Sequence, residues 1–185
     1  MSDQAFPSLR TPRLCLRRFQ DSDAAPFAAY RSVPEVARYQ GWEEPYSVEE
    51  AQRFVTTMAT APVDVPGQWI QIAVALPDTG SLVGDCAFAP LAHEPRTVEV
   101  GFTIAPDYQC QGYATEAVRE LLRYLFDTLH KHRVTASCDP RNLPSRRVLE
   151  ALGLRQESPL LDAPRSKSDW TDDLVFVIRR RDWTL

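Results

Sequence analysis

The sequence predicts a mixed fold of helices and strands, of the α+β or mixed α/β class, formed by one unit of 185 residues. Two observations on patterning predict this class. Four strand-like runs occur up to residue 105, at 14–19, 69–76, 81–91 and 98–105, and helices alternate with strands after the last of them. Apolar residues then recur every three or four positions from 112 to 129, which is typical of an amphipathic helix. The content of 44% hydrophobic and 25% charged residues is ordinary for a globular protein.

The first half of the chain contains one strand and two helices before the other strands. Leu14 to Phe19 alternates apolar and charged residues and is predicted to be a strand. The run Asp21-Ser22-Asp23 is typical of a helix start, and that helix carries Phe27 and Tyr30. Ser47 and Glu50 have the spacing of a capping box and begin a second helix, which the prolines of 61–67 end.

The second half contains the remaining strands and the two most regular helices. The runs 69–76 and 81–91 are joined by the turn sequence Pro77-Asp78-Thr79-Gly80, so we expect a β-hairpin. After the strand at 98–105, we expect a helix at 112–129, a strand at 133–138, a helix at 142–152 ended by Gly153, and a strand at 174–180.

Composition narrows the class of protein. The net charge of −4 and the pI of about 5.4 do not favour a nucleic-acid partner. No apolar run is long enough to span a membrane and no secretion signal is visible, so we expect a cytoplasmic protein. The four cysteines and three histidines lack metal-site spacing, so we expect no metal and interpret the cysteines as small apolar residues that fill the core.

The stretch QCQGYATEAV, from Gln109 to Val118, lies between a strand end and the start of the most regular helix. The first turn of a helix has unpaired N–H groups and a partial positive charge, which favour an anion. Gly112 leaves room for a ligand near the backbone. Neither GxxxxGK[ST] nor GxGxxG is present, which argues against a nucleoside triphosphate and a dinucleotide. Taken alone, the stretch is equally compatible with a tight turn that binds nothing.

The segment Q-C-Q-G-Y-A matches the Q/R-x-x-G-x-G/A signature of the GNAT superfamily of N-acetyltransferases, and its continuation resembles the RimJ/RimL-type branch. Other stretches that resemble this branch occur in the family's order: LRTPRLCLRRF, VGFTIAPDYQCQGYATEAV, DPRNLPSRRVLEALGL and WTDDLVFVIRRRDW. The resemblance implies one domain over 1–185 with a twisted, mostly antiparallel sheet that splays between its fourth and fifth strands and is flanked by helices. Two residues depart from the branch pattern, namely Cys110, where glycine is frequent, and Thr103, where an aromatic residue is common.

The resemblance also implies acetyl-CoA as co-substrate, with its pyrophosphate on the backbone of the loop before the long helix. It implies that the pantetheine arm meets the backbone of the strand at 98–105 and an asparagine at the start of the next helix. The cofactor-binding residues expected on this basis are Phe102, Ile104, Gln109, Cys110, Gln111, Gly112, Tyr113, Ala114 and Asn142. We interpret Glu116 as a residue that the helix dipole favours and that faces away from the ligand.

Acetyl transfer to an amine needs a group that accepts the amine's proton and a group that protonates the departing thiolate. Glu99 is the candidate base, because it lies on the strand beside the expected thioester and on the face that Gly101 opens; a solvated strand residue is the alternative. Asp85 is a second candidate base. Ser145 matches the family's Asn-x-x-Ser and is the candidate acid, unless Asn142 and Ser145 serve only the helix start. Gly101 itself is expected at a bulge or a point of close backbone approach.

The acceptor site is expected around Trp42, Tyr39 and Thr103, and along the segment 160–170; Trp42 is equally compatible with a role in the core. Trp170 and Asp172 match a W-x-D pattern of the family. The function expected from the resemblance is transfer of acetyl from acetyl-CoA to a primary amine, of a protein N-terminus or a small molecule, in a ternary complex. The alternative is a non-catalytic GNAT module that binds coenzyme A as a sensor or scaffold. The expected partner is the amine acceptor, with no nucleic acid, no membrane and a possible homodimer.

Overall fold

The computed structural model describes residues 6–157 and 173–184. In chain order, its elements are β1 (Leu9–Arg10), β2 (Cys15–Arg17), η1 (Asp21–Asp23), α1 (Ala24–Arg31), α2 (Pro34–Ala37), α3 (Val48–Thr60), β3 (Ile70–Ala75), β4 (Leu82–Pro90), β5 (Thr97–Ile104), η2 (Pro106–Tyr108), α4 (Tyr113–Arg123), η3 (Tyr124–Thr128), β6 (Arg133–Cys138), α5 (Leu143–Ala151), β7 (Arg155–Gln156), β8 (Leu174–Arg179) and η4 (Arg180–Asp182). The expected α+β class is confirmed.

The strands form one sheet in the order β1-β2-β3-β4-β5-β6-β8-β7. All neighbours are antiparallel except β5 and β6, which are parallel. The expected hairpin is β3 and β4. At the other edge, β8 comes last in the chain but lies between β6 and β7.

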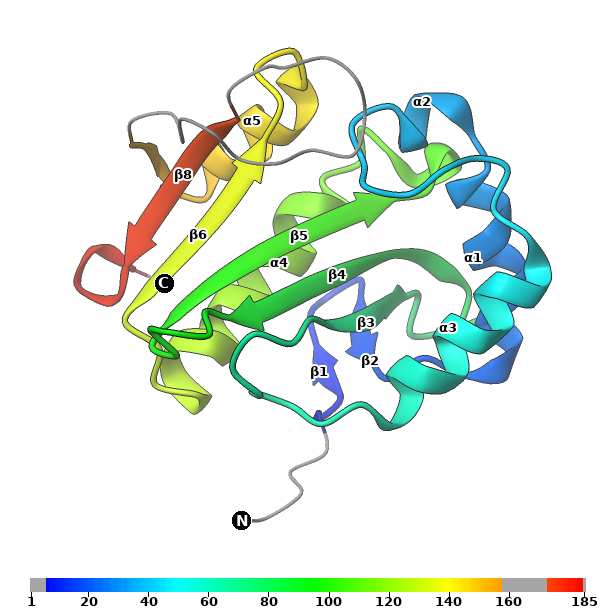
Figure 1. The fold of residues 1–185 in the computed structure, drawn as a ribbon, viewed down its shortest axis with the longest axis horizontal. Helices are drawn as coiled ribbons and strands as arrows, with labels where there is room; N and C mark the ends of the chain where they lie inside the picture. The colour runs from blue at the N-terminus through cyan, green and yellow to red at the C-terminus, as the bar shows by residue number, and fades with distance from the viewer. Residues whose placement is uncertain (1–5, 158–172, 185) are drawn as a thin grey trace.

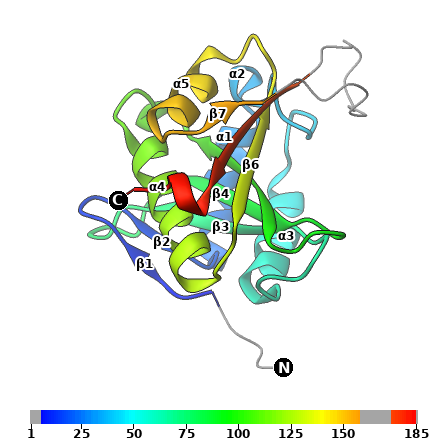
Figure 2. The same ribbon diagram turned by 90° about the vertical axis from the view of Figure 1, so that its left-hand side faces the viewer.

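Helices cover both faces of the sheet, with α4 on one side and α3 on the other (Figure 2). Alternation along the strands divides the apolar residues between two cores. Ile72, Val74 and Val100 pack with α4 and α5, whereas Ala73 and Leu82 pack with α1 and α3. Glu99 and Thr103 alternate with Val98 and Val100 and therefore point to the α1 and α3 side of the sheet.

Several expected boundaries differ from those of the structure. The long helix does not continue regularly to residue 129: α4 ends at Arg123, and a π-helical turn follows from Tyr124 to Thr128, in which the Leu129 N–H bonds the Tyr124 carbonyl. An apolar stripe does not distinguish the two kinds of turn, because both keep the same residues on the buried side. The short elements β1, α2 and β7 were also missed, since two to four residues carry too little pattern to be recognised. No helix in the described ranges is long and apolar enough to cross a membrane.

Candidate active site

The sheet opens between β5 and β6. The two strands pair at only three positions, Thr97–Arg133, Val98–Val134 and Glu99–Thr135, although β5 continues to Ile104 and β6 to Cys138. Figure 1 shows them diverging from a common start. β5 and β6 correspond to the fourth and fifth strands predicted from the sequence, at 98–105 and 133–138. The predicted splay between them is thereby confirmed. Glu99 is the last residue of β5 that pairs with β6.

The open end of the splay lies between two helix starts. Because β5 and β6 are parallel, their carboxyl ends point the same way, and each is followed by a helix: α4 after β5 and α5 after β6. The N-termini of α4 and α5 therefore lie at the diverging ends of the two strands. An opening at the carboxyl ends of neighbouring parallel strands, with helix N-termini beside it, is a general location for anionic ligands.

The loop before α4 is shaped by two residues in the left-handed region, Cys110 at a φ of 58° and Gly112 at a φ of 80°. No N–H group of residues 110–115 donates a hydrogen bond to another residue of the described chain. The Gln109 amide donates to the Ile104 carbonyl (2.8 Å) and the Gln111 amide to the Asp107 carbonyl (3.0 Å), and both bonds brace the loop. The backbone N–H groups are thus held in place without acceptors, as an anion site requires.

Arg13, from the connection between β1 and β2, lies against this loop. Its Nη1 donates to the Gln111 carbonyl (2.9 Å), and its guanidinium stacks on the Tyr113 ring, 4.7 Å from the centroid. Its Nε and Nη2 bond the Glu116 carboxylate at 2.7 and 2.6 Å, and Thr11 donates to the same carboxylate. Partial burial opposes ionisation of Glu116, but these bonds hold its pKa below the usual value. Glu116 therefore anchors the N-terminal segment to the helix start.

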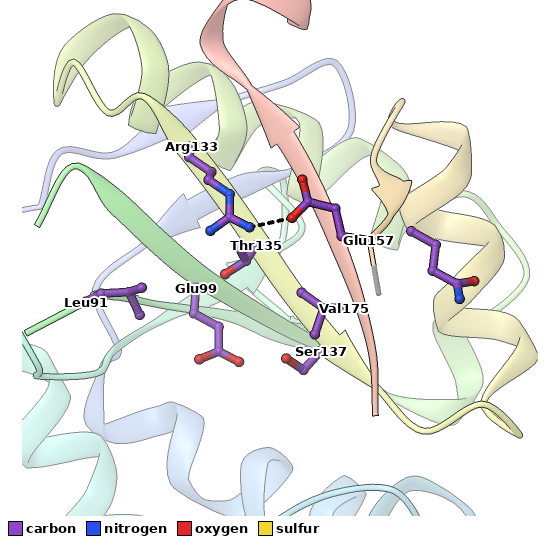
Figure 3. Close-up of a pocket in the computed structure, with 8 residues that line it drawn as sticks. Leu91, Glu99, Arg133, Thr135, Ser137, Glu157 and Val175 are labelled. Carbon is purple, nitrogen blue, oxygen red and sulfur yellow. Dashed lines mark hydrogen bonds and ion pairs between the residues drawn. The ribbon is translucent and has the colours of Figure 1, made fainter. Parts of the chain in front are cut away.

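A pocket of about 670 Å³ lies on the opening side of the sheet. It is lined by Leu91, Glu99, Arg133, Thr135, Ser137, Gln156, Glu157 and Val175. Arg133, Thr135 and Ser137 alternate along β6 and so share the face of the sheet to which Glu99 points. Arg133 forms an ion pair with Glu157 (2.8 Å), drawn as a dashed line in Figure 3.

The Glu99 carboxylate and the Ser137 hydroxyl point toward one another across the pocket (Figure 3). Burial raises the pKa of Glu99, and a hydrogen bond from Ser137 partly offsets this effect. A carboxylate with a raised pKa is a stronger base than one in water, so Glu99 is suited to accept a proton. Its predicted position beside the opening is what the structure shows, whereas its role stays a prediction.

The bulge considered at Gly101 is absent. The register between β4 and β5 runs without a shift from Gly84–Ile104 to Pro90–Val98, and Gly101 pairs with Ala87. An added Cβ at Gly101 would meet no atom within 4 Å. The same strand pair does contain a close approach, but at Gly84, where a Cβ would lie 2.2 Å from the Thr103 carbonyl oxygen.

Asn142 caps α5, as one of the two interpretations held: its side-chain oxygen accepts a hydrogen bond from the Ser145 N–H at 3.2 Å. Ser145 is half-buried in the first turn of the helix. It is not among the residues that line the pocket around Glu99, and its position comes from the topology alone, at the start of the helix that follows β6.

Asp85, the second candidate base, is only 1% exposed and is held by two hydrogen bonds, from the Tyr30 hydroxyl and from the Gln71 side-chain amide. Burial raises its pKa, and the nearby charge of Arg31 lowers it in part. Asp85 pairs with Thr103, which is also buried. This cluster connects α1 to the sheet and lies outside the pocket around Glu99.

Trp42 and Tyr39 lie in the segment between α2 and α3, and both are half-buried. The Trp42 ring stacks on the guanidinium of the buried Arg31 (3.9 Å), and its N–H donates to the Arg31 carbonyl at 3.0 Å. Phe27 lies against the same guanidinium at 4.1 Å. Trp42 therefore has a packing role in the protein, in line with the alternative of a core residue, and its contact with an acceptor stays a prediction.

Some expectations fall elsewhere. The segment 160–170, Trp170 and Asp172 lie outside the described residues. Three of the cysteines are buried, as expected of core residues, but Cys110 is exposed in the loop. Within 6–157 and 173–184, no group of three or more His, Cys, Asp or Glu residues is arranged to hold a metal ion.

Sequence reasoning missed Arg13 and Ser137. Arg13 lies about a hundred residues from the loop it contacts, and nothing local indicates such a contact. Ser137 had a usable signal, because strand alternation places it on the face of Arg133 and Thr135. Recognising it required knowing that β5 and β6 are neighbours, which only the fold shows.

A sheet that splits between two parallel strands, with helix N-termini at the opening, is the acyltransferase fold that the resemblance implies. Residues 13–155 match the acetyltransferase (GNAT) domain family. The chain belongs to this family, and it is an N-acetyltransferase. The expected resemblance is confirmed.

The relatives bear the same activity in their names. The chain is 30% identical to the uncharacterized N-acetyltransferase YnaD of Bacillus subtilis over 175 residues, covering 95% of this chain and 98% of that protein. It is 28% identical over 109 residues, 58% of this chain and 56% of the relative, to the [ribosomal protein uS5]-alanine N-acetyltransferase of Escherichia coli. Among solved structures, a GNAT acetyltransferase from Bacillus anthracis superposes with a TM-score of 0.83 at 28% identity and covers 95% of this chain and 99% of that one. RimJ of Mycobacterium smegmatis, solved with CoA-disulfide, shares the fold with a TM-score of 0.78 at 24% identity, covering 96% of this chain and 88% of its own.

Proposed function

We propose that the protein transfers the acetyl group of acetyl-CoA to a primary amine by direct attack in a ternary complex. The observation that carries this proposal is the end of β5–β6 pairing at Glu99, which places a carboxylate of raised pKa at the opening of the sheet. Family membership supports acetyl-CoA as the co-substrate. We further propose that residues 1–185 form one domain and that the protein acts in the cytoplasm. Its mass in solution distinguishes a monomer from a homodimer.

The described residues fit a diphosphate at the start of α4. The N–H groups of 110–115 have no acceptor in the described chain, and the Arg13 guanidinium, which is paired with Glu116, lies beside Gly112, where an added Cβ would lie 3.4 Å from Arg13 Nη2. Donors and charge without a metal suffice for a diphosphate at a helix N-terminus. We assign the backbone of Gln109 to Ala114 to this role, and Phe102, Ile104 and Asn142 to the pantetheine arm. One acceptor site on the Ile104 carbonyl is already used by Gln109.

The proposed steps use two side chains and the backbone of β5. Glu99, directly or through a water molecule, accepts the proton that the ammonium form of the amine loses before its nitrogen attacks the acetyl carbon. A free alkylamine has a pKa near 10.4, so the base is needed to provide the neutral nucleophile at neutral pH. An N–H group of β5 polarises the carbonyl oxygen. As the carbon–sulfur bond breaks, Ser145 donates a proton to the sulfur and takes up the second proton that the nitrogen loses, so that an N-substituted acetamide and the free thiol are the products.

The acceptor is best identified by thiol release from acetyl-CoA in the presence of single amines. The panel contains an amino acid, a polyamine, an antibiotic amine and a ribosomal-protein N-terminal peptide, because a relative acetylates the alanine of ribosomal protein uS5. Turnover with one class supports the proposal and names the acceptor. Binding of acetyl-CoA without turnover across the panel contradicts it and favours the alternative of a non-catalytic module.

The role of Ser145 is tested by Ser145→Ala. The variant is expected to lower kcat by about 10- to 100-fold while leaving the affinity for acetyl-CoA nearly unchanged, because only proton donation is lost. Steady-state kinetics and calorimetric binding measure the two quantities. Ser145→Thr, which keeps a hydroxyl, serves as the control. An unchanged kcat in Ser145→Ala would remove Ser145 from the mechanism.

For the acceptor we assign Trp42 and Tyr39 to the outer part of the site and Thr103 to its floor. Thr103 is buried beside Asp85, so its contribution is to the shape of the floor. Replacing Trp42 is expected to alter the acceptor KM and stability together, because its ring packs on Arg31.

A further inference from the structure

Gly101 occupies a position where the described structure gives no reason for a glycine. Its φ lies outside the left-handed region, the register with β4 is regular there, and an added Cβ would meet no atom within 4 Å. Glycine in the interior of a strand weakens the strand and has no side chain to pack. The neighbouring Gly84 shows the contrast, because its missing Cβ is required by the Thr103 backbone.

The space above Gly101 continues over the next strand. Ala87, its partner on β4, is the one residue of that strand that is not buried, although Asp85 and Ala89 on the same face are covered. Two small, half-buried residues, Ala87 and Gly101, thus form a floor in the middle of the sheet. No described atom lies within 4 Å of a Cβ added at Gly101.

This floor lies between the groups that the reaction needs. On β5, Glu99 is on one side of Gly101 and Thr103 on the other, all facing the same side of the sheet. Ser137 of β6 lies beyond the splay, where pairing with β5 has already ended at Glu99–Thr135. Gly101 lies two residues beyond Glu99, toward the open end of the splay and on the same face, so an amine that loses its proton to Glu99 would lie close to it.

We propose that the bare backbone at Gly101 is a specificity-determining position, which keeps open the passage for the amine between Glu99 and the splay and sets the bulk that the acceptor can carry next to its nitrogen. The inference rests on the proposed function. The inferred acceptors have an unbranched or lightly branched carbon beside the amine. In this proposal Gly101 limits the size of the acceptor and has no role in holding the coenzyme.

The test compares the wild type with Gly101→Ala and Gly101→Val on a series of primary amines of increasing branching at the carbon next to nitrogen. The Cβ that both variants add meets no neighbour within 4 Å, and valine is favoured in strands, so both variants are expected to fold with an unchanged or higher Tm and to bind acetyl-CoA as the wild type does. The value of kcat/KM is expected to fall about 10- to 100-fold more for the branched amines than for the smallest one, and more in Gly101→Val than in Gly101→Ala. Equal losses for all amines, or no loss, would overturn the proposal.

The matched control is Ser81→Thr, which adds one methyl group to an exposed residue of the hairpin turn and keeps the hydroxyl that bonds Thr79. It is expected to leave the amine preference unchanged. Gly84→Ala is the contrasting variant, expected to lose stability because its Cβ would strike backbone.

A second measurement does not depend on turnover. Gly101→Cys is treated with iodoacetamide, a small reagent that alkylates accessible thiols. The wild type is expected to show one fast-reacting thiol, Cys110, since the other three cysteines are buried, and the variant is expected to show two. An accepted amine, or the smallest amine at high concentration, is expected to slow the second reaction. A second thiol that reacts and is protected supports the passage even if no amine is acetylated, which would contradict the proposed function alone; an unreactive second thiol shows that the space is closed and overturns the inference.

Discussion

The loop before α4 contains a residue in a conformation that its type does not favour. Cys110 has a φ of 58°, in the left-handed region, where side chains with a Cβ lose roughly 1–2 kcal/mol relative to the right-handed conformation. This explains in physical terms why glycine suits this position of the loop. Because Cys110 is exposed, its side chain gains little from packing.

We therefore expect Cys110→Gly to raise the free energy of unfolding by about 0.5–1 kcal/mol, the strain relieved minus the greater entropy of glycine in the unfolded chain. Chemical denaturation with urea measures this difference. Gly112→Ala is the reciprocal control, because Gly112 has a φ of 80°, and it is expected to lower stability. A Cys110→Gly variant less stable than the wild type would show that the cysteine makes contacts worth more than its strain.

The pH dependence of catalysis reports on the pair Glu99 and Ser137. Burial raises the pKa of Glu99 and the Ser137 hydroxyl opposes that rise. A base acts when ionised, so kcat/KM increases as pH rises through the pKa of Glu99. In Ser137→Ala the stabilising hydrogen bond is lost, the pKa rises further, and the acidic limb of the profile is expected to move to higher pH.

The profile of kcat/KM against pH is measured for the wild type, Ser137→Ala and Ser137→Thr. Threonine keeps the hydroxyl and is expected to restore the wild-type limb. A limb that stays in place in Ser137→Ala, with kcat/KM reduced equally at all pH values, would mean that Ser137 does not act through Glu99.

Among the elements, helix α1 is attached to the sheet through a buried carboxylate. Asp85 of β4 accepts hydrogen bonds from Tyr30 of α1 and from Gln71 of β3. Burial raises the pKa of Asp85, so its protonated form is favoured by folding. The stabilisation linked to this proton is fully present below the unfolded pKa, near 3.9, and is lost as pH rises through the folded pKa.

The difference in unfolding free energy between Asp85→Asn and the wild type is therefore expected to increase as pH rises from about 4 through the folded pKa. Denaturation at several pH values measures it, and the subtraction removes the groups that titrate alike in both proteins. Asp85→Ala leaves two donors without a partner and is expected to lose about 2–6 kcal/mol near pH 4, at roughly 1–3 kcal/mol for each donor. A pH-independent difference for Asp85→Asn would show that Asp85 is ionised throughout.

Comparison of single helices and strands shows which parts of the site can be predicted from a local sequence pattern. The capping box of Ser47 and Glu50 and the Asn142 cap were predictable, because each is settled by residues three positions apart. The π-helical turn after Arg123 was not, because the extra residue per turn is accommodated by packing and leaves the apolar spacing of the stripe unaltered. The bulge considered at Gly101 was wrong for a related reason: a strand glycine is compatible with a bulge, a close approach or an open space, and the sequence does not distinguish them.

At the scale of the whole molecule, the mostly antiparallel sheet and its splay were expected from the resemblance, and the structure confirms both. The candidate site was predictable where it lies on consecutive residues, as in the loop 109–114, in which the N–H groups from residue 110 onward have no acceptor in the described chain. It was not predictable where distant segments meet. Arg13 reaches the loop from the first strands, and Ser137 faces Glu99 only because a parallel pair brings β5 and β6 together.

The position of β8 has a consequence for how the molecule is made. This strand is formed by residues 174–179, yet it lies between β6 and β7, which precede it in the chain. Until the ribosome has released these last residues, β6 has no partner on its outer side and β7 has none at all. The wall of the pocket that includes Val175 is likewise completed last. A chain shortened before residue 174 would leave β7 without its partner strand and β6 without a partner on its outer side.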